Sequence, residues 1–183
     1  MRLGLGSVGA NVQISKKASI YAPKNIFIAN NVRIDDYCVI TGGAGISIGR
    51  FVHIACFCAL YGGGGIVLED FCGLSSRVSI FSESDDYDGE SLTNPLIPRM
   101  FKPGYVSERV LIKRHSIVGA HSVILPGVTL NEGVAVGANS LVVRDCNEWT
   151  VYVGSPAKRI KNRSKHLLEL EHAFLHSLNV VKE

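Results

Sequence analysis

Aliphatic residues recur every 20 positions through the first 80 residues of the chain. Three such series run in parallel at fixed offsets: Val8, Ile28, Ile48 and Leu68; Ile14, Ile34, Ile54 and Leu74; and Ile20, Ile40, Leu60 and Ile80. Self-similarity at a short fixed period is typical of a solenoid. Three aliphatic positions per turn predict a coil with three sides.

After an interruption the same frame returns at Ile112, now with a turn of 18 residues that ends at Leu130. A unit of six residues is long enough for one short strand and a bend. Stacked units are therefore expected to pair as parallel strands about 4.8 Å apart, each contacting only its neighbours. The pattern predicts an all-β solenoid with a continuous aliphatic interior.

The frame breaks between residues 81 and 109. Leu68 and Ile112 are 44 positions apart where one turn takes 20, so about 24 residues (44 minus 20) leave the coil. This excursion loop is rich in Ser, Asp and Glu and then in proline, so it cannot be core. Long loops on regular scaffolds often carry function, although a loop that only covers an edge or a subunit contact remains an alternative. The preceding glycine run at 62–65 is expected to permit a sharp corner.

The end of the chain has a different pattern. From Ser164 onward, apolar residues are spaced for one stripe of a helix. They are Leu167, Leu168, Leu170, Phe174, Leu175 and Leu178. We therefore expect a solenoid over residues 1–160 and a helical extension over 161–183, which packs on the coil or on a neighbouring subunit and is suited to cover an open end.

Composition narrows the class of protein. A chain of 183 residues with 46% hydrophobic residues suits one domain. The net charge of +3 is modest and its basic residues gather near residues 158–165, which indicates a small anionic ligand rather than nucleic acid. The sequence has no export signal and no apolar run of about 18 residues, so we expect no membrane insertion and a cytoplasmic location.

The five cysteines do not suggest disulfide bonds. Cys38, Cys58 and Cys72 occupy core offsets of the repeat and are interpreted as small apolar fillers. Cys56 occupies an outward offset and is expected to be an exposed thiol without an evident activating partner.

Two stretches carry a family likeness. The hexads from Val118 to Leu130 and the ending Gly154-Ser155-Pro156-Ala157-Lys158-Arg159-Ile160 resemble the hexapeptide-repeat acyltransferases, especially galactoside, maltose and xenobiotic acetyltransferases and their relatives in O-antigen and capsule sugar synthesis. The resemblance implies a left-handed parallel β-helix, a homotrimer, acetyl-CoA as donor and active sites between adjacent subunits. The hand rests on the resemblance alone, because crossovers between parallel strands are usually right-handed.

One departure from that family concerns the catalytic base. Galactoside-type members carry a histidine early in the excursion, but this loop contains none. Of the six histidines, three lie in the helical pattern (His166, His172 and His176), and His115 and His121 are interpreted as structural or surface residues. His53 precedes an inward aliphatic residue, faces outward beside a corner and is our candidate general base, since histidine titrates near neutral pH.

The acidic start of the loop supplies further candidates. Asp85 and Asp86 are predicted to orient and charge-stabilise the imidazole of His53, or to bind acceptor hydroxyls. Glu83 and Tyr87 are weaker candidates for acceptor contacts. A loop that is merely solvated is the alternative for the whole cluster. A backbone amide near a glycine corner is the expected donor to the oxyanion.

The coenzyme residues follow from the resemblance. Small residues at Gly119, Ala120 and Ala138 match positions where related enzymes hold the pantetheine arm against the backbone. Arg144, Lys158 and Lys161 match the basic residues that face the phosphates, for which cations have a direct electrostatic reason. An ordinary basic surface tail is the alternative.

The leading hypothesis is an acetyl-CoA-dependent transferase that acts on a hydroxyl or amino group of a small-molecule sugar, with no metal. Two alternatives stay open. One is a zinc enzyme like the carbonic anhydrases of the same solenoid type, for which His53, His115 and His121 are the available coil histidines. The other is a scaffold without catalytic activity.

Overall fold

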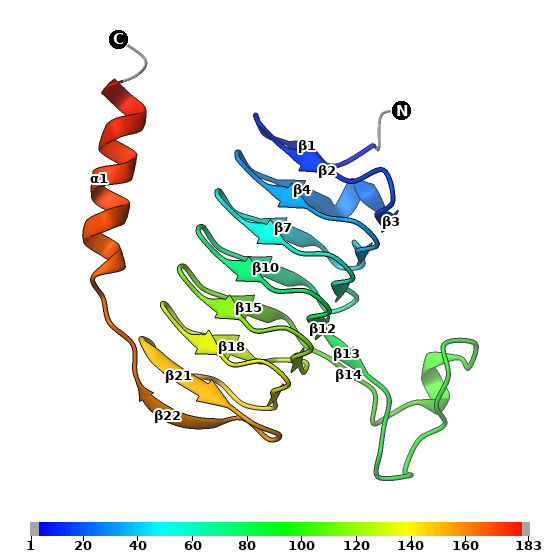
Figure 1. Ribbon diagram of the computed structural model, residues 1–183. Coiled ribbons are helices and arrows are strands. Elements are labelled where there is room, and N and C mark those ends of the chain that lie inside the picture. The colour runs from blue at the N-terminus through cyan, green and yellow to red at the C-terminus, as the bar shows by residue number, and fades with distance from the viewer. Residues whose placement is uncertain (1–3, 181–183) are drawn as a thin grey trace.

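The computed structural model describes residues 4–180 as one solenoid whose three parallel sheets form the sides of a triangular prism (Figure 1). Sheet A consists of β1 (Ser7–Val8), β4 (Ile26–Ile28), β7 (Ile46–Ile48), β10 (Ile66–Leu68), β15 (Val110–Ile112) and β18 (Thr129–Leu130). Sheet C consists of β3 (Ser19–Tyr21), β6 (Val39–Thr41), β9 (Ala59–Tyr61), β12 (Ser79–Phe81), β17 (Val123–Ile124) and β20 (Leu141–Val142). The predicted left-handed parallel β-helix is confirmed.

Sheet B is the longest side. It consists of β2 (Gln13–Ile14), β5 (Arg33–Ile34), β8 (His53–Ile54), β11 (Gly73–Leu74), β16 (Ile117–Val118), β19 (Ala135–Val136), β21 (Thr150–Val153) and β22 (Lys158–Asn162). Strand β22 pairs antiparallel with β21 and ends this sheet. The coil therefore extends to residue 162, two residues past the expected boundary. A short 3₁₀ turn, η1 (Pro23–Asn25), lies before β4.

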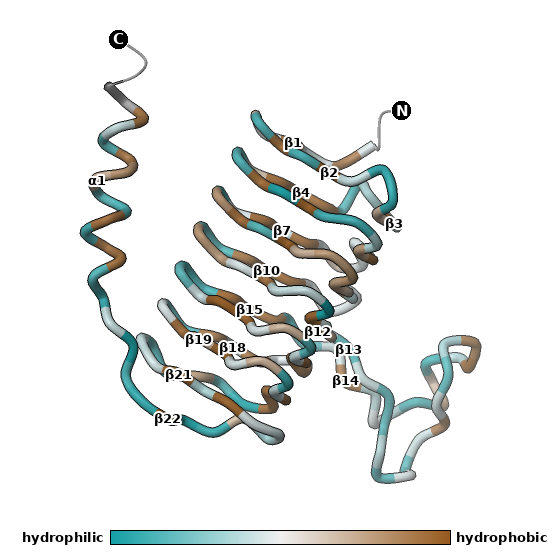
Figure 2. Tube along the Cα trace, viewed as in Figure 1, coloured by the Kyte–Doolittle hydropathy of each residue, from teal (hydrophilic) through white to brown (hydrophobic). Residues whose placement is uncertain are grey.

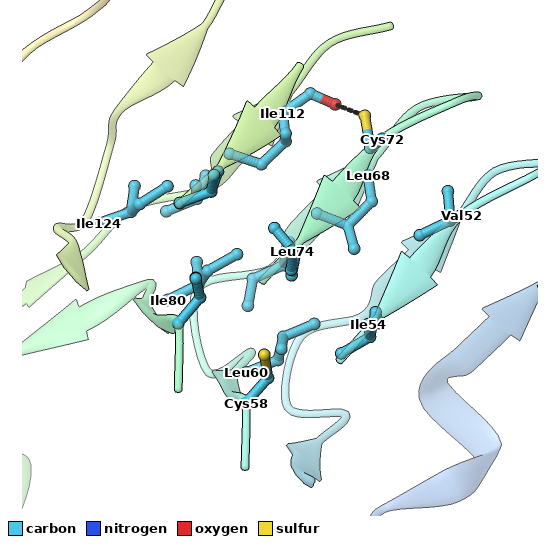
Figure 3. Close-up of a cluster of buried hydrophobic side chains, with 14 of the residues drawn as sticks. Val52, Ile54, Cys58, Leu60, Leu68, Cys72, Leu74, Ile80, Ile112 and Ile124 are labelled. Carbon is cyan, nitrogen blue, oxygen red and sulfur yellow. Dashed lines mark hydrogen bonds between the residues drawn. The ribbon is translucent and has the colours of Figure 1, made fainter. Parts of the chain in front are cut away.

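The repeat offsets become side-chain ladders inside the prism. Ile48 pairs in register with Leu68, and Ile54 with Leu74, so aliphatic side chains stack from coil to coil (Figure 3). Ile54 and Leu60 are fully buried. In the described residues β1 is the first strand of sheet A, and its Val8 is 56% exposed.

Three cysteines fill the core as predicted. Cys38, Cys58 and Cys72 are buried, and each thiol donates to a corner carbonyl of the following coil at 3.1 to 3.2 Å. Burial raises the pKa of the Cys72 thiol to about 12. All three residues are thus core fillers whose thiols have hydrogen-bond partners.

Three corners join the sheets: the first between A and B, the second between B and C, and the third between C and A. At the first corner, non-glycine residues occupy the left-handed region, with φ of 57° at Phe51, 61° at Phe71 and 59° at His115. Their rings stack along the solenoid, with centroids 4.9 Å apart for Phe51 and Phe71 and 5.2 Å apart for Phe71 and His115. Stacking between coils favours a conformation that a lone side chain would rarely adopt.

The C-terminal helix α1 (Leu167–Val180) packs against this ring ladder. Phe174 meets Phe51 edge-on at 5.2 Å, and Glu171 accepts a hydrogen bond from His115 at 2.9 Å. Figure 2 shows polar and apolar positions alternating along α1. The helix runs beside the coil, and β22 covers the last edge of sheet B instead (Figure 1). Within residues 4–180, no helix is both long and apolar enough to span a bilayer.

The excursion loop leaves at the third corner. Phe81 still pairs with Tyr61 in sheet C, so the loop covers residues 82–109. It projects on an antiparallel ribbon of β13 (Glu83–Ser84) and β14 (Val106–Ser107), with a 3₁₀ turn η2 (Arg99–Phe101) near its outer end (Figure 1).

The glycine run beneath the loop forms the expected corner, where Gly65 donates to the carbonyl oxygen of Gly62 at 3.0 Å, and it also makes room for the loop. Of the four glycines only Gly65 has positive φ (95°). A Cβ on Gly63 would overlap the carboxylate of Glu83, and one on Gly64 would lie 2.4 Å from the carbonyl oxygen of Ser82. Gly63 and Gly64 therefore make room for the base of the loop.

Candidate active site

His53 lies on the outer face of sheet B with a partner that the sequence did not indicate. Its side chain is 52% exposed, and its Nε2 lies 2.8 Å from Oδ2 of Asp35 in the preceding coil. The other oxygen of Asp35 accepts a hydrogen bond from Nε of Arg33 at 2.7 Å. A carboxylate that engages one ring nitrogen orients the imidazole and leaves the other nitrogen available for a substrate.

The electrostatics of Asp35 favour this role. Burial by itself raises the pKa of Asp35, but hydrogen bonds and charges of His53 and Arg33 outweigh it and hold the pKa below its usual range. The carboxylate is therefore ionised at neutral pH and can accept a hydrogen bond from the imidazole. Asp35 comes 18 positions before His53, two positions past the matching offset of the previous coil. Considering diagonal neighbours in the repeat frame could have found it.

A shallow hollow of about 360 Å³ extends from His53 along sheet B. The outward-facing positions that pair from strand to strand along sheet B form what we call its outward row. In this row Gly73 pairs directly with His53 in the parallel register. A Cβ on Gly73 would meet only Cγ2 of Ile117, at 3.7 Å. The missing side chain thus leaves bare backbone beside the imidazole, where a ligand can approach. Ser75 and Ser76 line the side toward the second corner.

The two loop aspartates engage groups of their own loop. Asp85 pairs with the ammonium of Lys102, which is only 6% exposed, and accepts a backbone hydrogen bond from Asn94 at 3.2 Å. Lys102 and Asn94 hold the pKa of Asp85 below its usual range. Asp86 accepts from the amides of Asp88 at 2.8 Å and Ser91 at 2.7 Å, which likewise lower its pKa. Both are ionised and weak bases.

A single chain does not bring these aspartates to His53. The loop departs from the corner between sheets C and A, and sheet B is the opposite side of the prism. Asp35 occupies the partner position that was predicted for Asp85 or Asp86. Their assignment to the same site as His53 stays a prediction, and it requires the loop of another subunit.

Glu83 and Tyr87 also lie apart from each other. Glu83 is half-buried at the base of the loop, over Gly63, and accepts a hydrogen bond from Ser107 at 3.2 Å. Tyr87 is 94% exposed. The exposed side chain of Tyr87 can contact an acceptor, whereas the side chain of Glu83 is already bonded within the β13–β14 ribbon.

The remaining coil histidines have separate environments. His115 is buried beneath Glu171 at the first corner, which confirms its structural interpretation, and His121 is exposed at the second corner. In the described part of the chain, no three His, Cys, Asp or Glu side chains converge in a way that could hold a metal ion. The three histidines considered for zinc are thus not one cluster.

The small residues assigned to the pantetheine arm gather at the second corner of the last coils. Gly119 and Ala120 connect β16 to β17, and Ala138 occupies the next coil. A Cβ on Gly119 would lie 2.4 Å from the backbone nitrogen of Ala138. Close packing between coils thus accounts for Gly119 independently, while the exposed Ala138 leaves the corner open to a ligand.

The basic residues divide into two places. Arg144 and Lys158 line one pocket of about 290 Å³ at the C-terminal end of the coil. Lys161 is exposed on β22, where it pairs with Val151 and continues the outward row of sheet B. Within that row, five strand spacings of about 4.8 Å, roughly 24 Å in all, separate His53 from Lys161.

Comparison with known proteins identifies relatives along almost the whole chain. No protein family model matches it. A dTDP-4-amino-4,6-dideoxy-D-glucose acyltransferase of Escherichia coli is 48% identical over 173 residues, which cover 94% of this chain and 90% of that enzyme.

Solved structures agree with this relationship. AntD, an N-acyltransferase from Bacillus cereus in complex with dTDP and 3-hydroxybutyryl-CoA, is 48% identical with a TM-score of 0.94, covering 97% of this chain and 94% of that one. A variant of AntD in complex with dTDP-4-amino-4,6-dideoxyglucose and coenzyme A is 47% identical with a TM-score of 0.93, covering 96% and 93%. A hexapeptide-repeat acetyltransferase of Vibrio cholerae in complex with acetyl-CoA, 21% identical with a TM-score of 0.60 over 88% and 73% of the chains, shares the fold.

Proposed function

This chain belongs to the hexapeptide-repeat acyltransferases, and from that premise we propose that it acylates the 4-amino group of a 4-amino-4,6-dideoxy sugar carried on dTDP, with acyl-CoA as donor. The main support for this choice of acceptor is the 48% identity with the Escherichia coli enzyme. The match leaves about ten residues (183 minus 173) uncovered, fewer than the loop contains. The loop is therefore part of the likeness.

The reaction requires a deprotonated amine and a polarised thioester. The amine nitrogen attacks the thioester carbonyl, the carbon–sulfur bond breaks, and an amide and coenzyme A form. The proton lost by the nitrogen goes first to a base and ends on the departing sulfur. In our proposal His53 is that base, and Asp35 holds its ring and stabilises the imidazolium that forms.

We further propose that the working unit is a homotrimer with each site between two chains. The support is topological: His53 and the acidic loop lie on opposite sides of one prism, and a neighbouring copy can supply the loop that one chain cannot. Aromatic side chains at the second corner also remain exposed, Tyr37 by 50% and Phe57 by 43%. Such a surface is suited to contact another copy.

The coenzyme is proposed to run along the last coils, with its pantetheine arm near Ala138 and its thioester toward the bare backbone at Gly73. Arg144 and Lys158 share a pocket in which two cations can face phosphates. Lys161 supplies a third positive charge at the end of the sheet B row. The acceptor then approaches His53 from the side of the neighbouring loop.

Substrate assays test the proposed activity directly. Incubation with acetyl-CoA and dTDP-4-amino-4,6-dideoxyglucose is expected to release free thiol and to produce the amide, detected by mass spectrometry. The matched control is the same sugar nucleotide with a hydroxyl in place of the amine. Transfer to the hydroxyl compound alone, or no transfer to either, contradicts the proposal.

Substitution of His53 tests the base. We expect His53→Asn to lower kcat about 10²- to 10⁴-fold, because a positioned general base contributes that much, while calorimetry shows unchanged coenzyme binding and light scattering an unchanged trimer. Asp35→Asn should lower kcat less and alter its pH dependence, since it orients a base that is still present. A fully active His53→Asn enzyme removes His53 from the mechanism.

A further inference from the structure

A shallow apolar groove of about 440 Å³ lies between helix α1 and the solenoid. Its floor comes from the coil and its wall from the helix. The carbon-rich members are Phe51, Phe71, Ile117, Leu167, Leu170 and Phe174. Leu170 is 59% exposed and Ile117 is 45% exposed, so the helix leaves the groove open.

The three polar residues that line this groove, His115, Arg163 and Glu171, are already paired. His115 and Glu171 share a hydrogen bond of 2.9 Å, and Arg114 also binds the Glu171 carboxylate. Arg163 donates to the carbonyl oxygens of His115 at 2.7 Å and of Gly133 at 3.0 Å. A ligand in the groove would therefore find hydrocarbon surface and no vacant charge, which suits an aliphatic chain.

The groove adjoins the hollow beside His53. The aromatic residues of the groove floor lie close in sequence to the outward-facing positions of sheet B. On each coil the aromatic residue comes two positions earlier: Phe51 before His53, Phe71 before Gly73, and His115 before Ile117. Ile117 lines both the groove and the hollow. A chain that starts at the bare backbone of Gly73 can thus pass over Ile117 into the groove.

We propose that this groove binds the hydrocarbon tail of an acyl donor longer than acetyl, such as a four-carbon acyl-CoA. The inference rests on the proposed function, because it assumes that the thioester lies near His53. It assigns to helix α1 a part in donor choice, since Leu167, Leu170 and Phe174 form the wall of the groove. The relative from Bacillus cereus was solved with a four-carbon donor, 3-hydroxybutyryl-CoA.

Calorimetry with acetyl-CoA and butyryl-CoA tests the groove without an acceptor. Burial of two more methylene groups is expected to make butyryl-CoA bind roughly tenfold more tightly. Leu170→Trp fills the groove and should reduce this ratio to about one. The matched control is Leu178→Trp, a leucine on the same helix outside the groove, which should keep the ratio of the original chain.

Three results overturn the proposal. The first is equal binding of both donors by the original chain, and the second is a ratio that Leu170→Trp does not change. The third is a change of oligomeric state in Leu170→Trp by light scattering, which would mean that a second copy covers the groove. Transfer assays separate this inference from the proposed function: acetyl transfer to the amino sugar with no four-carbon preference refutes the groove only. Absence of transfer with either donor refutes the function, while the binding ratio still decides the groove.

Discussion

The coils and the excursion loop are held together by different means. In the coils every strand pairs with the same offset of the next turn, and the same residue types stack from Ile34 through Ile54 to Leu74. The loop has one short ribbon, and its outer part depends on individual polar contacts such as those of Asp86 and Lys102. Tyr105 is likewise held by individual side chains. Cζ of Arg99 and Nζ of Lys102 lie 4.0 and 4.4 Å from the centroid of its ring.

This difference separates stability from specificity. Each coil packs against the coils on both sides. Its core residues can therefore vary among aliphatic types as long as the interior stays filled. A loop built from single contacts has no such redundancy, and one change can alter its shape. The coil can therefore stay constant while the loop adapts to an acceptor.

The largest expected effect comes from the middle of the coil. Ile54→Ala should lower the free energy of unfolding by about 2 to 5 kcal/mol, because the side chain is fully buried and leaves a cavity. Urea denaturation followed by circular dichroism measures the loss. The control is Ile14→Ala, at the same offset near the open end, where the side chain is only half-buried and the loss should be clearly smaller. Equal losses would mean that coil position does not matter.

The next effect should stay within the loop. Lys102→Met removes a buried ammonium and leaves Asp85 without its ionic partner, so hydrogen exchange of amides in residues 85–105 should accelerate at least about tenfold. The unfolding free energy of the coil should change by less than about 1 kcal/mol, an ordinary point-mutation effect. Lys17→Met, which removes an exposed ion pair of the coil, should leave loop exchange unchanged. Global destabilisation by Lys102→Met would show that loop and coil unfold together.

The smallest effect is a dependence on acid. The pKa values of Asp85 and Asp86 are lowered in the folded loop, so their contribution is complete above the unfolded value of about 3.9 and is lost as pH falls through the folded values. Pepsin cleavage in the loop, relative to a free peptide of the same sequence, should therefore rise below about pH 4. Circular dichroism should show the coil intact under the same conditions. A constant cleavage ratio from pH 5 to pH 2 would contradict the assigned contacts.

The repeat frame was enough to predict much of the fold. It located the core ladders, three of the four buried cysteines and the place of the excursion, because period and burial follow from which residues are apolar. The helix and its packing on the coil were predicted from the apolar stripe, although the helix begins at Leu167 and not at Ser164. The purpose of Gly63 and Gly64 could not be predicted, because the group that occupies their missing Cβ space, the loop base, is defined only after the chain returns.

For the candidate site, sequence by itself determined the residue types and their offsets: an outward histidine at position 53, an acidic loop without histidine, and small residues in the closing coils. Tertiary structure decided which of them meet. It placed Asp35 against His53, sent the loop aspartates to the opposite side of the prism, and set helix α1 over the ring ladder. The physical reason is that periodicity specifies which way a side chain points. Contacts depend on which coil, corner or helix lies within hydrogen-bonding or van der Waals distance, and these distances arise only when the whole chain packs.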